Sequence, residues 1–192
     1  VETVLVTPNV LDVPTSVMAL DKTSLTAGET VEARVTARDV HENVIDSKWF
    51  ASVLTAEDET YSMAYDAGAL QYVKEFTLTQ ARVWAFSATL EGTAVPETFD
   101  VTVSPAAISN SDCTLRLDRN SAETGDSIKA MFGIKDVYLN DIPETGHTVI
   151  FDFWTDQNSG DTVTATFNST SGLYEADSPQ AFKVGTDRKS VV

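Results

Sequence analysis

The side chains best suited to acid–base or nucleophilic chemistry are few in this sequence. It contains two histidines, His41 and His147, and one cysteine, Cys113. The histidines do not occupy equivalent places in the internal repeat described below, and no serine, aspartate or cysteine motif accompanies either one, so no nucleophile–base pair is indicated. Cys113 begins a strand-like segment, where a half-buried structural thiol is expected rather than a nucleophile. We therefore expect no catalytic residues and no enzyme activity.

Acidic clusters are the next candidates, because carboxylate oxygens are the ligands that Ca²⁺ prefers. The run Glu57–Glu59 and the group of Asp136, Asn140 and Asp141 could offer such oxygens. Neither has the spacing of an EF-hand loop or a repeated Asp-x-Asp pair. Solvated acidic loops and local turns explain them as well, so we expect no metal site and no cofactor.

Asn168 begins the triplet Asn168-Ser169-Thr170, which satisfies the acceptor rule for N-glycosylation. A chain so rich in serine and threonine produces such a triplet by chance. Asn168 is therefore a candidate modification site that permits a secreted setting without showing one.

Composition excludes several classes of protein. The chain has 192 residues, 13 Lys and Arg against 29 Asp and Glu, and a net charge of −16. This charge repels phosphate backbones and anionic lipids, which argues against nucleic-acid binding. No apolar run approaches the ~20 residues of a membrane span, so we expect no direct membrane insertion in this segment. A single cysteine cannot close an intrachain disulfide, so packing alone must hold the fold.

Alternation with a period of two is the main structural signal. Val31, Ala33 and Val35 alternate with charged or polar residues, and the segments 84–90 and 99–103 repeat the pattern. Such alternation is typical of antiparallel strands with one buried and one wet face. Short turn signals separate the segments, which favours an all-β sandwich. The aromatic residues of these strands are expected to fill the core: Trp49, Tyr61, Tyr65, Trp84 and Phe86.

The sequence repeats itself after 97 residues. The pairs that keep this spacing without a gap are Pro8 and Pro105, Leu20-Asp21 and Leu117-Asp118, Gly28 and Gly125, Asp39-Val40 and Asp136-Val137, Asn43 and Asn140, and Ile45 and Ile142. The alternation is kept as well: the apolar positions of the strand 31–37 are apolar again 97 residues later, so the same face is expected to be buried in both copies. Beyond this span the shift grows to 102, which predicts about five extra residues near 158–161 in the second copy.

The repeat predicts the organisation of the chain. Residues 3–8 match the closing strand 100–105, so residues 1–8 are expected to finish a preceding repeat. Residues 9–105 form a complete repeat, and residues 106–192 form a second one without its last strand. The chain is thus expected to be part of a longer tandem array.

The turns can be explained from residue types. Gly28 and Gly125 supply a positive φ where the chain reverses. Asp39 and Asp136 can accept hydrogen bonds from their own downstream amides, and Asn43 and Asn140 tolerate the left-handed conformation. These turn-defining residues are expected to serve shape.

These motifs resemble the filamin-type immunoglobulin-like repeat. The resemblance rests on the turn Ala27-Gly28-Glu29, the alternating strand 31–37 and the turn from Arg38-Asp39 to Asn43, with equivalents in the second copy, and it covers nearly the whole chain. Glu42 and Leu139 stand where that family has glycine. Bacterial invasin-type immunoglobulin-like repeats share the same turns and are the competing family. Both imply tandem immunoglobulin-like antiparallel β-sandwiches.

In filamin-type repeats, peptide partners add a strand beside the third strand of the sandwich, and the resemblance implies the same here. The matching segments are 47–54 and 147–154. In the second of these, both faces are apolar, so it is the candidate binding edge, formed by Val149, Ile150, Phe151, Phe153 and Trp154.

We therefore expect a non-catalytic structural segment of a multi-repeat filament, stalk or scaffold, whose partners are proteins or neighbouring repeats. The alternative is a cell-surface adhesion or peptide-binding module that acts through a strand edge; a third possibility is an accessory domain of a large enzyme. The filamin resemblance implies the cytoskeleton. The acidic, lysine-poor composition favours an extracellular or cell-surface location.

Overall fold

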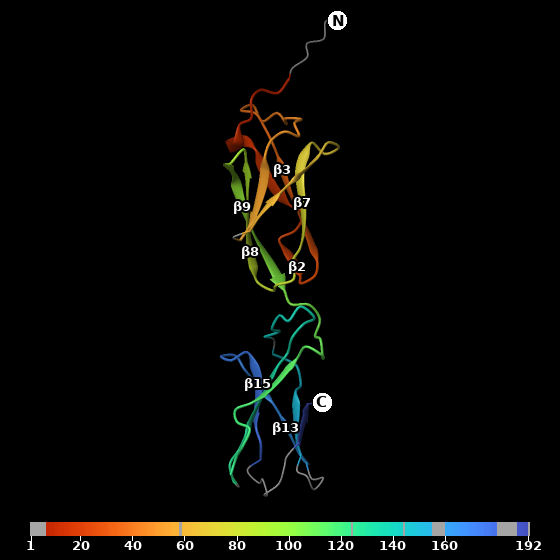
Figure 1. The fold of residues 1–192 in the computed structure, drawn as a ribbon, viewed down its shortest axis with the longest axis vertical. Coiled ribbons are helices and arrows are strands. Elements are labelled where there is room, and N and C mark those ends of the chain that lie inside the picture. The colour runs from red at the N-terminus through yellow and green to blue at the C-terminus, as the bar shows by residue number, and fades with distance from the viewer. Residues whose placement is uncertain are drawn as a thin grey trace, which may run out of the picture. The chain divides into compact units, whose positions relative to one another are not determined.

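The computed structural model describes residues 7–57, 59–123, 125–143, 145–154, 160–179 and 188–191, the last of these as backbone. It divides into two compact units, Val1–Ser104 and Pro105–Val192. Each unit is described by itself (Figure 1). The expectations for residues 1–6, for Asp58 and for most of the extra loop in the second copy lie outside the described residues.

Unit 1 is built from strands and one short 3₁₀ turn. The elements are η1 (Val13–Thr15), β1 (Val17–Leu20), β2 (Ser24–Thr26), β3 (Thr30–Thr36), β4 (Ser52–Ala56), β5 (Glu59–Ser62), β6 (Ala64–Asp66), β7 (Gln71–Thr77), β8 (Val83–Leu90) and β9 (Thr93–Ser104).

Two sheets form unit 1. One has the strand order β1-β3-β7-β6 and the other the order β2-β9-β8-β4-β5. All pairs are antiparallel except β2 with β9. The sheets pack face to face, because Phe76 of β7 lies 5.7 Å from Phe86 of β8 between ring centroids, and 5.0 Å from Tyr61 of β5.

The predicted alternation of buried and exposed residues along each strand explains this core. Val31, Ala33 and Val35 of β3 are fully buried, and Phe86 and Leu90 of β8 are buried in the same way on the opposite sheet. Their neighbours along each strand are partly or fully exposed. Burial of one face of each sheet is the main stabilising contribution to such a sandwich.

Unit 2 contains β10 (Thr114–Leu117), β11 (Lys129–Gly133), β12 (Ile150–Trp154), β13 (Gly160–Thr164), β14 (Thr166–Asn168), β15 (Leu173–Asp177) and β16 (Arg188–Val191). One sheet has the order β10-β11-β15-β14, and the other the order β13-β12-β16.

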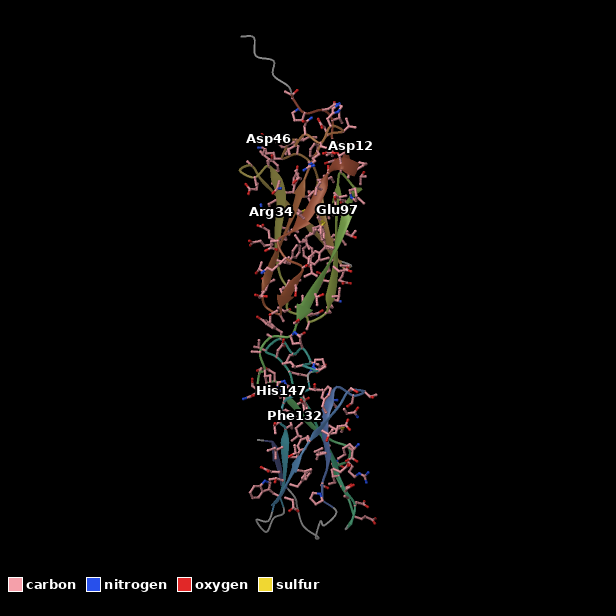
Figure 2. The ribbon with its side chains drawn as sticks, turned by 180° about the vertical axis from the view of Figure 1, so that it is seen from behind. Asp12, Arg34, Asp46, Glu97, Phe132 and His147 are labelled. Carbon is pink, nitrogen blue, oxygen red and sulfur yellow. The ribbon has the colours of Figure 1, made fainter. Side chains whose placement is uncertain are left out.

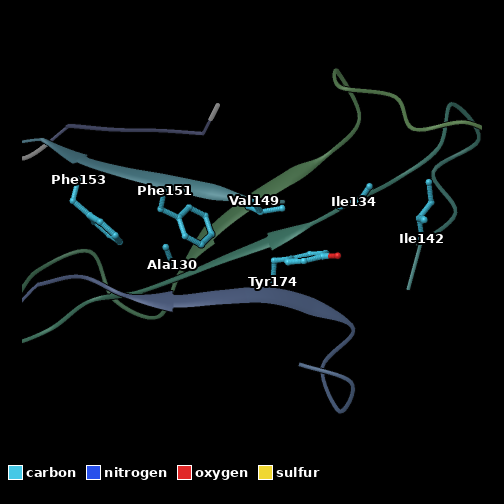
Figure 3. Close-up of a cluster of buried hydrophobic side chains, with 7 residues drawn as sticks. All are labelled: Ala130, Ile134, Ile142, Val149, Phe151, Phe153 and Tyr174. Atoms are coloured by element: carbon cyan, nitrogen blue, oxygen red, sulfur yellow. The ribbon is translucent and has the colours of Figure 1, made fainter. Parts of the chain in front are cut away.

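The core of unit 2 lies between these sheets (Figure 3). Phe151 and Phe153 of β12 point toward Ala130 of β11 and Tyr174 of β15. Val149, Ile134 and Ile142 extend the same buried cluster. Aromatic rings supply much of its apolar area, as is usual in small sandwiches.

The two units share their strand pairing. Met18 pairs with Val35 in unit 1, and Leu115 pairs with Phe132 in unit 2, at residues 97 apart. Leu54 of β4 is fully buried, as is its counterpart Phe151 of β12. The expected fold class, all-β with tandem immunoglobulin-like antiparallel sandwiches, is confirmed.

In each unit a glycine lies in the turn that leads into β3 or β11. Gly28 has a φ of 93° and Gly125 a φ of 99°. A side chain is strongly disfavoured at these angles, so glycine relieves strain at each reversal.

Candidate functional site

A buried carboxylate organises the loop that follows β3. Asp39 has only 1% of its surface exposed. Its Oδ1 accepts hydrogen bonds of 2.9 Å from the backbone N–H groups of His41 and Asn43. Its Oδ2 accepts one of 2.8 Å from the backbone N–H of Asn9, which lies 30 residues earlier. The side-chain amide of Asn43 donates to both oxygens. One side chain thus closes the loop and holds the segment that enters the unit.

Unit 2 repeats this arrangement. Asp136 is completely buried. Its Oδ1 accepts from the backbone N–H of Tyr138 at 2.8 Å and of Asn140 at 2.9 Å, and its Oδ2 from Ala106 at 2.8 Å. Ala106 follows Pro105, and Asn9 follows Pro8, so the entering chain is tied at equivalent places. We define the buried aspartate loops as residues 39–43 and 136–140.

Hydrogen bonding stabilises the ionised form of both aspartates. The backbone N–H of Asn9 and the side-chain amide of Asn43 hold the pKa of Asp39 far below its ordinary value and outweigh the effect of burial. For Asp136, burial is the largest single effect and acts to raise the pKa, but the hydrogen bonds from Asn140, Ala106 and Tyr138 together outweigh it, so its pKa is also lowered. These groups are fixed anions with all their acceptors in use, which suits a structural role rather than proton transfer.

The left-handed residue of each loop is not the one that the sequence predicted. Glu42 has a φ of 63° and Leu139 a φ of 67°, whereas Asn43 and Asn140 are not among the positive-φ residues. The two asparagines instead contribute their side-chain amides, which donate hydrogen bonds to the aspartates. The strained backbone falls one residue earlier, at the position where the filamin-type pattern has glycine.

A buried tyrosine binds the segment that precedes β4 in unit 1 and the one that precedes β12 in unit 2. Tyr72 Oη donates to the carbonyl of Ser47 at 2.7 Å and accepts from the backbone N–H of Phe50 at 3.0 Å. In unit 2, Tyr174 Oη accepts from the backbone N–H of His147 at 3.1 Å. Burial raises the pKa of Tyr72, so the phenol stays protonated and able to donate.

The candidate binding edge at 149–154 was wrong. β12 pairs with β13 on one side and with β16 on the other, so it is an interior strand. Ile150 pairs with Thr164, and Trp154 pairs with both Gly160 and Arg188. Val149, Phe151 and Phe153 are buried in the core and cannot meet a partner. β4 is interior in the same way, between β8 and β5.

One aromatic residue is exposed where the sequence predicted core. Trp49 keeps 81% of its surface accessible, with the ammonium of Lys48 lying 4.9 Å from its ring centroid. It lies between Tyr72's two hydrogen-bonding partners, Ser47 and Phe50, just before β4. Of the other four aromatic residues predicted to fill the core, Phe86 is buried, and Tyr61, Tyr65 and Trp84 are half-buried. No sequence signal distinguished Trp49 from them, since the alternating pattern begins only at Ser52.

Of the side chains considered first for chemistry, His41 lies in unit 1, and Cys113 and His147 lie in unit 2. His41 is exposed in its loop, Cys113 is half-buried and reduced, and His147 is half-buried with Nε2 enclosed and unpaired among the described residues. Cys113 and His147 line one cavity of about 460 Å³ in unit 2. In the described part of the chain, no three His, Cys, Asp or Glu side chains gather as a metal site would require.

Asn168 lies at the end of β14 with its side chain engaged. Its Nδ2 donates to Glu175 Oε1 at 3.1 Å, and its Oδ1 accepts from the backbone N–H of Thr170 at 2.9 Å. The Ser171 hydroxyl and the Asn168 amide lower the pKa of Glu175. The side chain therefore serves the fold of this turn, and glycosylation of Asn168 stays a prediction.

Comparison with known proteins shows which solved structures share this fold. No family model matches the chain, and no curated protein matches it in sequence. Solved structures do match. FdeC, an Escherichia coli adhesin, is 21% identical with a TM-score of 0.53 over 92% of this chain. Yersinia pseudotuberculosis InvD is 18% identical with a TM-score of 0.50 over 97%, and the adhesin InvE from the same organism is 15% identical with 0.51 over 95%.

The fold is an immunoglobulin-like sandwich pair of the kind found in these bacterial proteins. Of the two families considered from the sequence, the invasin-type is thus the one that structural similarity supports. The chain spans 59%, 56% and 59% of the lengths of the three matched structures. Among the described residues, no helix is long and apolar enough to cross a membrane.

Proposed function

We propose that this chain is a non-catalytic segment of a bacterial surface protein that takes part in adhesion. The observation that carries the proposal is the similarity of both sandwiches to the corresponding parts of FdeC and InvE, which are adhesins, over at least 92% of the chain. A net charge of −16 supports a location outside the cell, where high charge keeps an exposed protein soluble.

The arrangement of polar groups supports a binding or structural role. Asp39 and Asp136 are the buried carboxylates of the two loops, and their oxygens accept hydrogen bonds from backbone amides. Asp39 is 1% exposed and Asp136 is 0% exposed, so a substrate cannot reach either carboxylate. The ligands proposed for the chain are partner proteins or neighbouring repeats.

A second candidate function is that of a spacer in a stalk. The same hydrogen bond in both units favours this role. The backbone N–H of Asn9 donates to Asp39, and that of Ala106 donates to Asp136, so each sandwich fixes its entering segment in the same way. In an array of such modules each one contacts only its neighbours, which suits a spacer. A surface stalk and an adhesion segment are compatible roles for one chain.

Labelling of intact cells tests the location. Antibodies raised against the purified chain are expected to stain unpermeabilised cells of the source organism and to lose the signal after brief protease treatment. Staining that requires permeabilisation would contradict the proposal. A periplasmic protein, exposed only after outer-membrane disruption, serves as the control for cell integrity.

A further inference from the structure

A cavity of about 620 Å³ opens in unit 2 at the edge where β13 and β14 lie. Residues of β11, β13, β14 and β15 line it, together with Ser169, and the structure describes all of them. The strand orders β13-β12-β16 and β10-β11-β15-β14 put β13 and β14 at the edges of their sheets, and β12 separates β13 from β16. The volume is that of a small-molecule site, for which about 300–1,000 Å³ is usual.

Short side chains leave this space open. β13 pairs with β12 as β5 pairs with β4, and this register puts Val163 where unit 1 has Tyr61. β15 pairs with β11 as β7 pairs with β3, which puts Ala176 where unit 1 has Lys74. In unit 1 the ammonium of Lys74 lies 5.8 Å from the ring centroid of Tyr61, so the two longer side chains occupy this place. The cavity is thus a property of the side chains of unit 2 and is not required by the fold.

A hydrogen-bonded group of polar side chains forms part of the lining. Glu175 Oε1 accepts hydrogen bonds from Asn168 Nδ2 at 3.1 Å and from the Ser171 hydroxyl at 2.7 Å. Lys129 Nζ lies 3.5 Å from Glu175 Oε2. The hydrogen bonds from Ser171 and Asn168 lower the pKa of Glu175, so its carboxylate stays ionised. The lysine ammonium carries three N–H donors, so it can also donate to a ligand.

Exposed polar side chains complete this part of the lining. Thr164, Thr166 and Asp177 are exposed and face the same cavity. A threonine hydroxyl both donates and accepts hydrogen bonds, whereas an ionised carboxylate only accepts. The cavity therefore offers donors and acceptors next to each other.

Phe167 supplies an apolar wall to the cavity. It is half-buried, and its ring centroid lies 5.2 Å from that of Tyr174, which fixes the ring in place. Tyr174 pairs along the sheet with Phe132, which is labelled in Figure 2. The half-buried side chains of Val163 and Ala176 extend the wall.

We propose that this cavity binds an uncharged saccharide unit of a glycan. A sugar ring carries hydroxyl groups that donate and accept hydrogen bonds, and its C–H groups form an apolar face, so it matches both parts of the lining. The carboxylates of Glu175 and Asp177 outnumber the ammonium of Lys129, which disfavours an anionic ligand. An apolar ligand is disfavoured as well, because it would bury these charged groups without giving them a hydrogen-bonding partner.

Titration of the full chain with simple sugars tests the site. The probes are the methyl glycosides of glucose, galactose, mannose and N-acetylglucosamine, added at millimolar concentrations to isotope-labelled chain and followed through its backbone amide signals. At least one glycoside is expected to give saturable shifts at the amides of Phe167, Asn168 and Ala176. N-acetylneuraminic acid, an anionic sugar, is expected to leave these signals unchanged.

Substitutions within the cavity locate the binding. The double variant with Val163→Tyr and Ala176→Lys rebuilds the side chains of unit 1 and is expected to abolish the shifts. Thr162→Lys adds the same charge to an exposed position of β13 that does not line the cavity, and it should bind as the native chain does. Asp177→Ala removes an exposed acceptor without filling the space, and it is expected to weaken binding about tenfold through the loss of a hydrogen bond to a charged group. This variant decides the question if the double variant does not fold.

The absence of saturable shifts with all four glycosides would overturn the proposal. Shifts that the cavity variants leave unchanged would overturn it too. Equal binding of N-acetylneuraminic acid would contradict the assignment to an uncharged sugar. The proposal goes beyond the adhesive role proposed above, because a free sugar binds whether or not the chain takes part in adhesion, so the failure of one leaves the other standing.

Discussion

The backbone N–H of Ala106 donates a hydrogen bond of 2.8 Å to the buried carboxylate of Asp136, across 30 residues of sequence. The same bond joins Asn9 to Asp39 at the same distance in unit 1. Each sandwich therefore uses one ionised side chain to fix both a loop and the entering segment. A charge-assisted hydrogen bond to a buried carboxylate is among the stronger single contributions to a fold.

Replacement of Asp136 by alanine tests this contribution in unit 2. Asp136→Ala leaves the amides of Ala106, Tyr138 and Asn140 without their acceptor, and the expected loss of unfolding free energy is about 3 kcal/mol. Urea unfolding followed by the fluorescence of Trp154, the tryptophan of unit 2, measures it. Asp141→Ala is the control in the same region, because its exposed carboxylate pairs with Lys135 at the surface and the expected change is within about 0.5 kcal/mol. Similar losses in the two variants would contradict the account.

Acid is expected to weaken unit 1 through Asp39. Its pKa is lowered in the folded state, first by the backbone N–H of Asn9 and then by the Asn43 amide. The unfolded chain therefore binds a proton before the native one does, so this stabilisation is present above the ordinary aspartate pKa of about 3.9 and declines as the pH falls below about 5. Urea midpoints from Trp49 and Trp84 fluorescence should fall more steeply with acid in the native chain than in Asp39→Asn. Parallel pH curves would speak against the mechanism.

The stability of unit 1 should depend on the inward-facing side chains of β8 and not on the outward-facing ones. Phe86 is 1% exposed and packs on Phe76, so Phe86→Ala is expected to cost about 3–5 kcal/mol. Val83 on the same strand is 54% exposed, and Val83→Ala is expected to cost less than about 0.5 kcal/mol. Thermal and urea unfolding of the two variants give the comparison; equal costs would show that β8 does not present the face described.

The backbone at Gly125 should resist a side chain. A Cβ at this position meets no atom within 4 Å, but the φ of 99° disfavours any L-residue. Gly125→Ala is therefore expected to cost about 1–2 kcal/mol through backbone strain alone. Gly68, whose φ is not positive, gives the comparison variant Gly68→Ala. Its added Cβ would lie 3.3 Å from the carboxylate oxygen of the exposed Asp66, which can shift, so this change should be closer to neutral. A neutral Gly125→Ala would indicate a different backbone at this turn.

The sequence was sufficient for features that depend on local pattern. The parity of Val31, Ala33 and Val35 predicted which face of β3 is buried, because side-chain direction alternates in any strand. The glycine at the reversal followed from the small set of residues that adopt a positive φ.

Features that depend on distant segments could not be predicted in this way. The reach of Asp39 to Asn9 spans 30 residues, and only its bonds to nearby amides followed from the residue type. β12 looked like an edge because both its faces are apolar, but pairing with β16 is set by a segment more than 30 residues away. The sequence predicts Trp49 to be core, because composition does not show where a strand begins.

Binding of coated beads to cells tests the central claim most directly. Beads that carry the folded chain are expected to attach to cultured epithelial cells in a saturable way and to be displaced by the soluble chain. Beads that carry an unrelated β-sandwich of matched negative charge control for surface charge. Attachment no greater than this control, with the chain folded on the beads, would contradict a role in adhesion.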